Sequence, residues 1–163
     1  MSEIYEAVVV LAKADAVAAA LASSTASLRL RVTPLSASLT GVHRIASRNE
    51  PLQAEAIHAL AARLSVLGSS AALLYDNRVG LRSAVLFERG APLREYGPDT
   101  ERWVPLDEQG LPIQSAPPVL LKDLQPPEEY EVIASAIDQA LTDLLGPEPH
   151  VSAATLNAVF TAC

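Results

Sequence analysis

Residues 51–67 have the apolar spacing of an amphipathic helix, and this segment constrains the fold more than any other part of the chain. Its apolar residues recur three or four positions apart and therefore line one side of a helix. This stripe consists of Ile57, Leu60, Ala61, Leu64 and Leu67. Ser47 or Asn49 can cap the helix. Pro51 suits its first turn and Gly68 suits its exit. A helix with one apolar side predicts a second layer of structure against which that side packs.

Short apolar runs before and after this helix have the character of β-strands. The run 8–11 is rich in β-branched residues, which favour a buried strand. In residues 27–32 leucines and a valine alternate with two arginines, a pattern typical of a half-exposed strand. Extended structure is also predicted over 37–46 and 71–75. The helix is therefore expected to pack on a sheet.

A second, alanine-rich helix is predicted over residues 16–23, with Asp15 as its cap. With this helix included, the element order of residues 1–76 is β-α-β-β-α-β. That order is the ferredoxin-like arrangement, in which an antiparallel sheet carries two helices on one face. The predicted fold class is therefore α+β. Ferredoxin-like folds support many activities, so the order predicts no function.

Residues 77–163 begin with a pattern that adds strands to this sheet. Strands are expected over 82–88 and 92–96, joined by a tight turn at Arg89-Gly90. The acidic, turn-rich sequence that follows continues the antiparallel meander. The sheet is therefore expected to be mainly antiparallel and wider than the ferredoxin-like half alone.

The C-terminal part is predicted to hold one or two further helices. One begins near Glu128, where acids complement the positive N-terminus of a helix. A short last helix is expected after Ser152 and carries Phe160 on an apolar side with little polar cover. That side and the edge of the added strands predict a homodimer. No composition shift marks a domain boundary, so residues 1–163 are expected to form a single domain.

The net negative charge of the chain is concentrated in residues 95–131. The 163 residues carry a formal net charge of −7. This window alone holds nine acidic residues against Arg102 and Lys122, which is also a net charge of −7. The rest of the chain is therefore balanced. Such an asymmetry indicates a partner or a solubility feature more often than a fold.

Composition and motifs argue against several classes of function. The isoelectric point near 4.9 disfavours nucleic-acid binding, since phosphate contacts need clustered Lys and Arg. The sequence has no Gly-rich phosphate loop, nucleophile elbow or metal-ligand spacing, so no cofactor and no metal are expected. The acidic start lacks the positive region of a signal peptide, and the single Cys163 fits a reducing compartment. A cytoplasmic protein is expected.

The remaining polar residues have ordinary structural interpretations. His43, His58 and His150 share no ligand spacing and are expected on the polar surface. Arginines of the predicted meander are expected to pair across strands with Glu88 and Glu95 rather than to clamp an anion. These arginines are Arg78, Arg82, Arg89 and Arg94.

Aromatic residues are few, yet Tyr96, Trp103 and Tyr130 lie in the acidic stretch. Tyr and Trp anchor protein interfaces, and acidic rims steer basic partners. An equal alternative is that Trp103 only covers the edge of the sheet. The interface interpretation predicts a non-enzymatic binding module, of the inhibitor, immunity or adaptor type, that recognises a basic protein. The predicted partner-binding residues are Tyr96, Asp99, Glu101, Trp103, Asp107 and Glu108.

A second hypothesis stays open beside this one. It is a small-molecule-binding or catalytic α+β domain with a pocket between the sheet and the helices. Arg29, Arg31 or His43 would supply the polar groups of such a pocket. A deep pocket lined by these residues distinguishes this hypothesis from the binding module.

Overall fold

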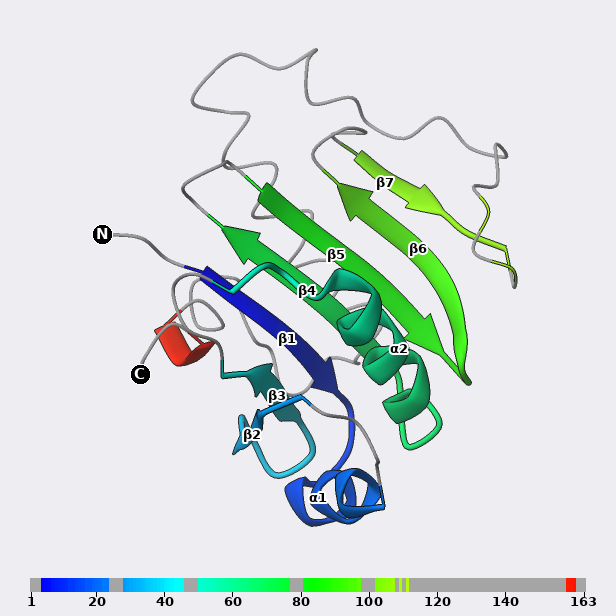
Figure 1. Ribbon diagram of the computed structural model, residues 1–163. Helices are drawn as coiled ribbons and strands as arrows, with labels where there is room; N and C mark the ends of the chain where they lie inside the picture. Colours follow the sequence, from blue (N-terminus) through cyan, green and yellow to red (C-terminus); the bar gives the residue numbers. More distant parts are fainter. Residues whose placement is uncertain are drawn as a thin grey trace.

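The computed structural model is built on one sheet of seven antiparallel strands, with two helices against it (Figure 1). It describes residues 4–23, 28–45, 50–76, 81–97, 102–107, 109, 111 and 158–160. The strands are β1 (Ile4–Val10), β2 (Leu30–Pro34), β3 (Thr40–Arg44), β4 (Ser70–Asp76), β5 (Leu81–Glu88), β6 (Ala91–Gly97) and β7 (Arg102–Pro105). The helices are α1 (Ala14–Ala22) and α2 (Ala54–Leu64). The α+β class predicted from the sequence is confirmed.

The strand order across the sheet is β2-β3-β1-β4-β5-β6-β7. β1 is therefore flanked by β3 and β4, which follow it only after α1 and α2 respectively. From β4 onward each strand pairs with the next one in the sequence. The turn between β5 and β6 is at Arg89-Gly90, as predicted. Both residues have positive φ angles, 52° and 83°, which suit the tight turns of hairpins.

The caps of both helices differ from the sequence-based predictions. The N-cap of α1 is Lys13, and Asp15 lies inside the first turn, where its carboxylate accepts a 2.8 Å hydrogen bond from the Ala16 amide. The N-cap of α2 is Gln53, so the helix begins too late for Ser47 or Asn49 to cap it. No side chain of either N-cap residue makes a capping hydrogen bond. At the start of α2 a tertiary contact, the hydrogen bond from the Gln53 amide to the Glu6 carboxylate, takes the place of the local cap that the sequence suggested.

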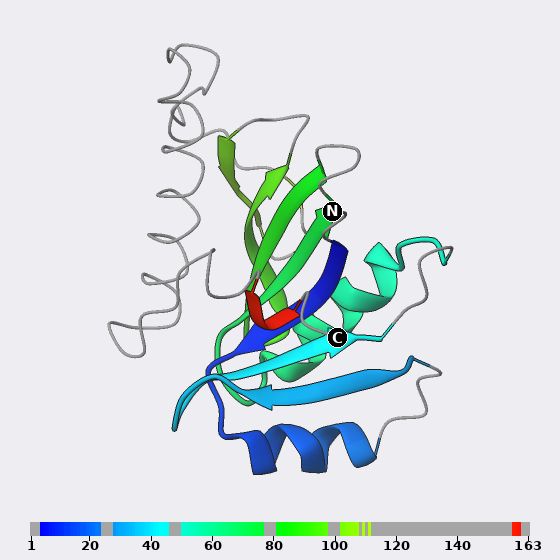
Figure 2. The same ribbon diagram turned by 90° about the vertical axis from the view of Figure 1, so that its left-hand side faces the viewer.

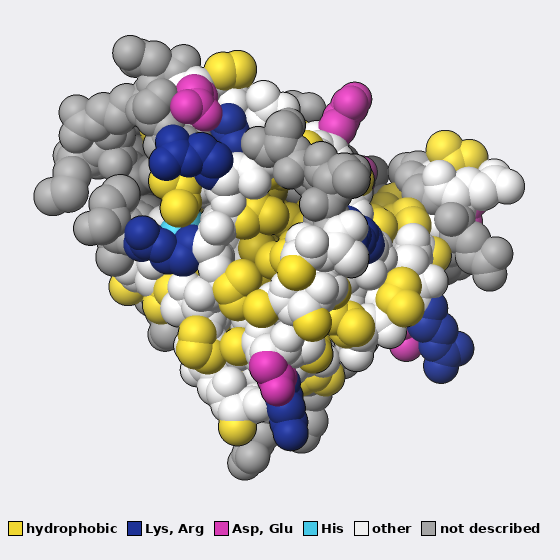
Figure 3. Space-filling model, turned by 60° about the horizontal axis from the view of Figure 1, so that its bottom comes forward, with side chains coloured by type: hydrophobic (Ala, Val, Ile, Leu, Met, Phe, Trp, Pro, Cys, Tyr) yellow, Lys and Arg dark blue, Asp and Glu magenta, His cyan; other side chains and the backbone are white. Residues whose placement is uncertain are grey.

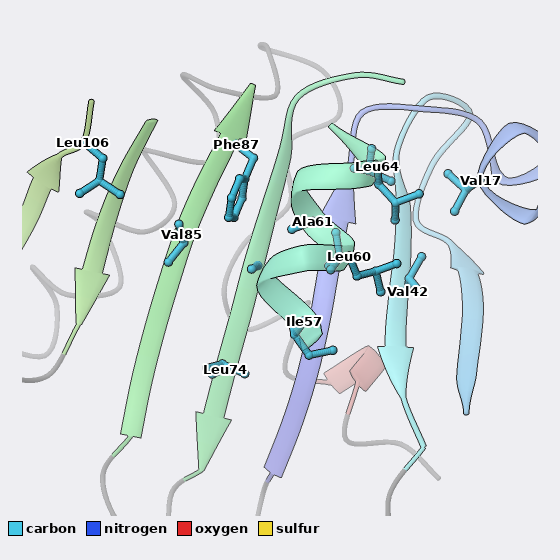
Figure 4. Close-up of a cluster of buried hydrophobic side chains, with 13 residues drawn as sticks. Val17, Val42, Ile57, Leu60, Ala61, Leu64, Leu74, Val85, Phe87 and Leu106 are labelled. Carbon is cyan, nitrogen blue, oxygen red and sulfur yellow. The ribbon is translucent and has the colours of Figure 1, made fainter. Parts of the chain in front are cut away.

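One face of the sheet, which we call the helix face, carries the larger of two buried clusters (Figure 4). The stripe of α2 packs there against Val8, Val42 and Val85, and α1 adds Val17. The predicted stripe is confirmed at four buried positions, which are Ile57, Leu60, Ala61 and Leu64. The fifth, Leu67, is 43% exposed because the helix ends before it.

The opposite face of the sheet, which we call the second face, carries the smaller cluster. Its buried residues include small side chains in the middle of the sheet, Ala7, Ala71 and Ala84. Phe160 packs on them from a short helical turn, residues 158–160, which lies on the side of the sheet away from α2 (Figure 2). The two faces are therefore packed by different means.

Within the part of the chain that the structure describes, no helix is long and apolar enough to cross a membrane.

Candidate functional site

Two of the predicted partner-binding residues lie on neighbouring strands at one end of the sheet. Tyr96 belongs to β6 and Trp103 to β7, and their Cα atoms are direct partners in the antiparallel register. One position further along, Glu95 lies opposite Val104. β7 is the last strand in the order of the sheet. The structure therefore brings the two aromatic positions together at a sheet edge within the acidic segment.

Asp107 lies just beyond β7 and holds a local turn. Its Oδ1 atom accepts hydrogen bonds of 2.9 Å from the backbone amides of Gln109 and Leu111. Its own amide donates to the carbonyl oxygen of Leu111 at 2.8 Å. One carboxylate oxygen of Asp107 is thus committed to its own loop. The other predicted acids, Asp99, Glu101 and Glu108, lie outside the described residues.

His58 lies on α2 and faces the same end of the sheet. Its ring centroid is 6.5 Å from that of Phe87 on β5. Its Nε2 atom is buried and has no hydrogen-bond partner among the described residues. Burial lowers the pKa of His58, and the negative charges of Glu95 and Glu55 partly oppose that shift. His58 is half-buried rather than a surface residue, because α2 packs across β1, β4 and β5 and its ring lies near Phe87 of β5.

His43 departs further from the predicted surface position and is only 6% exposed. It lies on β3 between Ala7 of β1 and Arg31 of β2, so it is flanked by strands on both sides. Its ring packs on Phe160, with centroids 5.5 Å apart. The prediction of a surface histidine is wrong because it took no account of a C-terminal residue that covers this strand.

This placement also bears on the hypothesis of a pocket between the sheet and the helices. His43 packs on Phe160 on the second face, whereas α1 and α2 cover the helix face. Arg29 and Arg31 are exposed on or beside β2 at the other end of the sheet order. His43 is therefore not in a position to line a pocket between the sheet and the helices.

A buried ion pair on the helix face was not foreseen from the sequence. Glu6 of β1 and Arg44 of β3 are 2.6 Å apart, with side chains only 3% and 7% exposed. Arg44 also donates to the carboxylate of Glu50 at 2.6 Å and to the carbonyl oxygen of Pro51 at 3.2 Å. The second carboxylate oxygen of Glu6 accepts a hydrogen bond from the amide of Gln53. The pair therefore fixes the start of α2 to the sheet. Glu6 is the single acid in the otherwise apolar sequence of β1, and this feature could have indicated a buried ion pair.

The register does not place the predicted cross-strand ion pairs opposite one another. Arg94 lies opposite Leu86 on β5 and opposite Pro105 on β7. Glu95 lies opposite two valines, and Glu88 lies opposite Ala91. The two-residue turn at Arg89-Gly90 and a register shift at Leu86/Phe87 set these partners. Directly opposed Arg–Glu pairs are thus absent from the described part of this hairpin.

The described residues contain no group of three or more His, Cys, Asp or Glu side chains that could hold a metal ion. In the view of Figure 3 their charged side chains are scattered among hydrophobic and uncharged ones. Comparison of the chain with protein-family models, with curated proteins and with solved structures found no significant match.

Proposed function

We propose that this protein is a non-enzymatic binding module that recognises a basic partner protein through the end of the sheet formed by β6 and β7. The observation that carries the proposal is the direct pairing of Tyr96 with Trp103 on the last two strands of the sheet. The pair lies within residues 95–131, a segment whose net charge equals the −7 of the whole chain. We call this surface the acidic edge; it comprises Tyr96, Asp99, Glu101, Trp103, Asp107 and Glu108.

Three physical features support recognition at the acidic edge. The last strand of a sheet offers backbone N–H and C=O groups that a partner strand can use. Aromatic residues at the centre of an interface supply most of its binding energy. Clustered acids accelerate encounter with a basic protein, because oppositely charged surfaces attract over a Debye length of about 10 Å at 0.1 M salt.

The test begins with capture of a partner by cross-linking in cells and continues with the kinetics of the purified pair. Asp99→Asn combined with Glu101→Gln should mainly lower the association rate constant, and this effect should vanish at high salt. Trp103→Ala should mainly raise the dissociation rate constant. The matched control is Asp15→Asn with Glu55→Gln, which removes the same charge from exposed positions on α1 and α2. Recognition at the acidic edge would be refuted if both double variants lowered the association rate constant equally. It would also be refuted if that rate constant did not depend on ionic strength.

We further infer that β1 to β4 with α1 and α2 form a ferredoxin-like unit and that β5 to β7 are an added meander. The strand order β2-β3-β1-β4 supports this inference, since it interleaves two β-α-β units. An experimental structure with β1 at the edge of the sheet would contradict it.

We further propose that the protein forms a homodimer and that it is located in the cytoplasm. Light scattering at high protein concentration should give twice the 17.2 kDa of one chain, and a monomer mass would remove the dimer. Fractionation of cells that express a tagged chain tests the location separately.

A further inference from the structure

Phe160 occupies a slot on the second face of the sheet. Its side chain is only 4% exposed. Its ring centroid is 5.4 Å from that of Tyr5 on β1 and 5.5 Å from that of His43 on β3. The floor of the slot is Gly41, where an added Cβ would lie 2.7 Å from the phenyl ring. Tyr5, Gly41 and His43 therefore form the Phe160 slot, and it accepts the ring because position 41 has no side chain.

The docked turn is short, and few of the described residues hold it in position. Residues 158–160 form less than one full turn of helix, which has no stability of its own in water. Ala158 is exposed and Val159 is only partly buried, whereas Phe160 is buried. The ring of Phe160 is thus the main apolar anchor of this turn among the described residues.

The polar wall of the slot is unusual, because His43 is buried without full hydrogen bonding. Its Nδ1 atom has no hydrogen-bond partner among the described residues. Arg31 of β2 lies directly opposite it in the register, and Arg29 precedes Arg31 by two residues. From β1 the nearest titratable side chain on this face is Tyr5, and from the C-terminal turn only the phenyl ring faces it. None of these groups is an acid, so nothing among them compensates a positive charge on His43.

We propose that residues 158–160 are a releasable latch on the second face and that protonation of His43 opens it. While Phe160 covers the slot, His43 is neutral. A proton on His43 places a charge between the phenyl ring and Arg31, and water must reach the imidazolium to stabilise it. Departure of Phe160 admits that water and exposes the apolar side chains beneath the turn.

The direction of the pH dependence follows from the environment of His43. Burial and then the charge of Arg31 lower its pKa below the 6.5 of an exposed histidine. Release of Phe160 removes part of that burial and brings the pKa back toward 6.5. The released form therefore binds the proton more readily, and docking is favoured at high pH. As the pH falls below 6.5, the ratio of docked to released turn falls by at most about tenfold per pH unit, as for one linked proton.

The single cysteine supplies a probe for this motion. Cys163 follows Phe160 by three residues, so a nitroxide attached to it reports the local mobility of the C-terminal turn. Spectra are recorded on the full chain between about pH 7.5 and about pH 5.2, above the range where ordinary carboxylates titrate. Circular dichroism at each pH verifies that the sheet stays folded. We expect the mobile component of the spectrum to grow as the pH falls.

Four variants and one control variant make the test specific. Phe160→Ala and Gly41→Ala should give the mobile spectrum at every pH, the first by removing the ring and the second by filling its place. His43→Phe should give a docked turn with no pH response. Arg31→Gln, at an exposed position, should shrink the response because the docked turn then tolerates the protonated ring better. His58→Gln is the control, since it removes the half-buried histidine of the opposite face.

Two results would overturn the latch. A label that is equally mobile in the wild type and in Phe160→Ala at neutral pH would show that the ring does not hold the turn. A response that persists undiminished in Arg31→Gln and His43→Phe would show that another group senses the proton. Should His43→Phe fail to fold, Arg31→Gln alone decides the second point.

Discussion

The two faces of the sheet are built from alternate residues of the same strands, yet they are packed in different ways. On the helix face valines of β1, β3 and β5 meet the branched side chains of α2. On the second face alanines of β1, β4 and β5 leave room for an aromatic group formed by Tyr5, Tyr75 and Phe160, with Tyr5 and Tyr75 stacked at 5.3 Å. A period of two along a strand therefore determines two independent surfaces.

The most buried polar groups of the two faces are bonded differently, although the half-buried His58 of the helix face also has a nitrogen without a partner among the described residues. On the helix face the carboxylate of Glu6 is paired with Arg44 and bonded to the start of α2. On the second face His43 is buried beside Phe160, and its Nδ1 atom has no partner among the described residues. A fully bonded polar group fixes one arrangement, whereas an incompletely bonded one leaves the arrangement open to protons or ligands. We therefore regard the helix face as the stable scaffold and, on the proposed latch, the second face as the adjustable one.

The largest effect is expected from breaking the ion pair of the helix face. Arg44→Met leaves the buried carboxylate of Glu6 without its cation, and we expect a loss of about 3–5 kcal/mol in the free energy of unfolding. Urea denaturation measures it. The double variant Glu6→Gln with Arg44→Met should recover part of this loss because no unpaired charge remains. A loss below about 1 kcal/mol would show that the pair is not the scaffold element described above.

The next largest loss of stability is expected from truncating Leu60, a buried apolar residue of the same face. Leu60 is 7% exposed between α2 and the sheet, and Leu60→Ala should cost about 2–5 kcal/mol through lost burial and a residual cavity. Val66→Ala is the control, since Val66 is 75% exposed and its truncation should stay within about 0.5 kcal/mol. Similar urea midpoints for the two variants would mean that the buried side of α2 is wrongly placed.

The sequence predicted the parts of this scaffold that depend on local pattern. The spacing of Ile57, Leu60 and Leu64 identified the buried side of α2, and short apolar or alternating runs located the strands β1 to β6. Partners brought together over long sequence distances were missed. Glu6 and Arg44 are 38 residues apart, and Phe160 reaches His43 from the end of the chain. The cap of α2 was misplaced for the same reason, since a carboxylate from β1 bonds the start of that helix.

The candidate site was predictable only in outline. Composition located the acidic segment and its aromatic residues, but the register that sets Tyr96 opposite Trp103 depends on the length of the β6–β7 connection and on how the two strands pair. Asp107 Oδ1 accepts two backbone hydrogen bonds within its own loop, and these depend on backbone geometry that cannot be read from the residue pattern. Which residues lie opposite one another and which backbone groups bond a side chain are determined by the assembled sheet and cannot be read from the local sequence.

Gly68 tests the close packing between β1 and the segment that leads into β4. A Cβ at this position would lie 1.9 Å from the carbonyl oxygen of Leu11, and backbone must move to admit it. Gly68→Ala should therefore cost about 1–3 kcal/mol by overpacking. Gly90→Ala is the control: no described atom lies within 4 Å of a Cβ at position 90, so any cost there comes from its φ of 83° and not from overpacking. Crystal structures of the two variants should show a displaced backbone around Leu11 in Gly68→Ala but not in Gly90→Ala. An unshifted Leu11 would exclude overpacking.

The smallest expected effect is on the pH dependence of stability, and it distinguishes His58 on the helix face from His43 on the second face. Burial lowers the pKa values of both His58 and His43, so the unfolded chain binds more protons than the folded one below about pH 6.5. The free energy of unfolding is therefore fully retained above that pH and declines as the pH falls below it, by less than about 1.4 kcal/mol per pH unit for each group. His58→Gln should flatten this decline in urea titrations at several pH values, while the pH response of residues 158–160 stays as in the wild type. If His58→Gln changed both responses together, the two faces would act as one unit, and the division between a scaffold face and an adjustable face would fail.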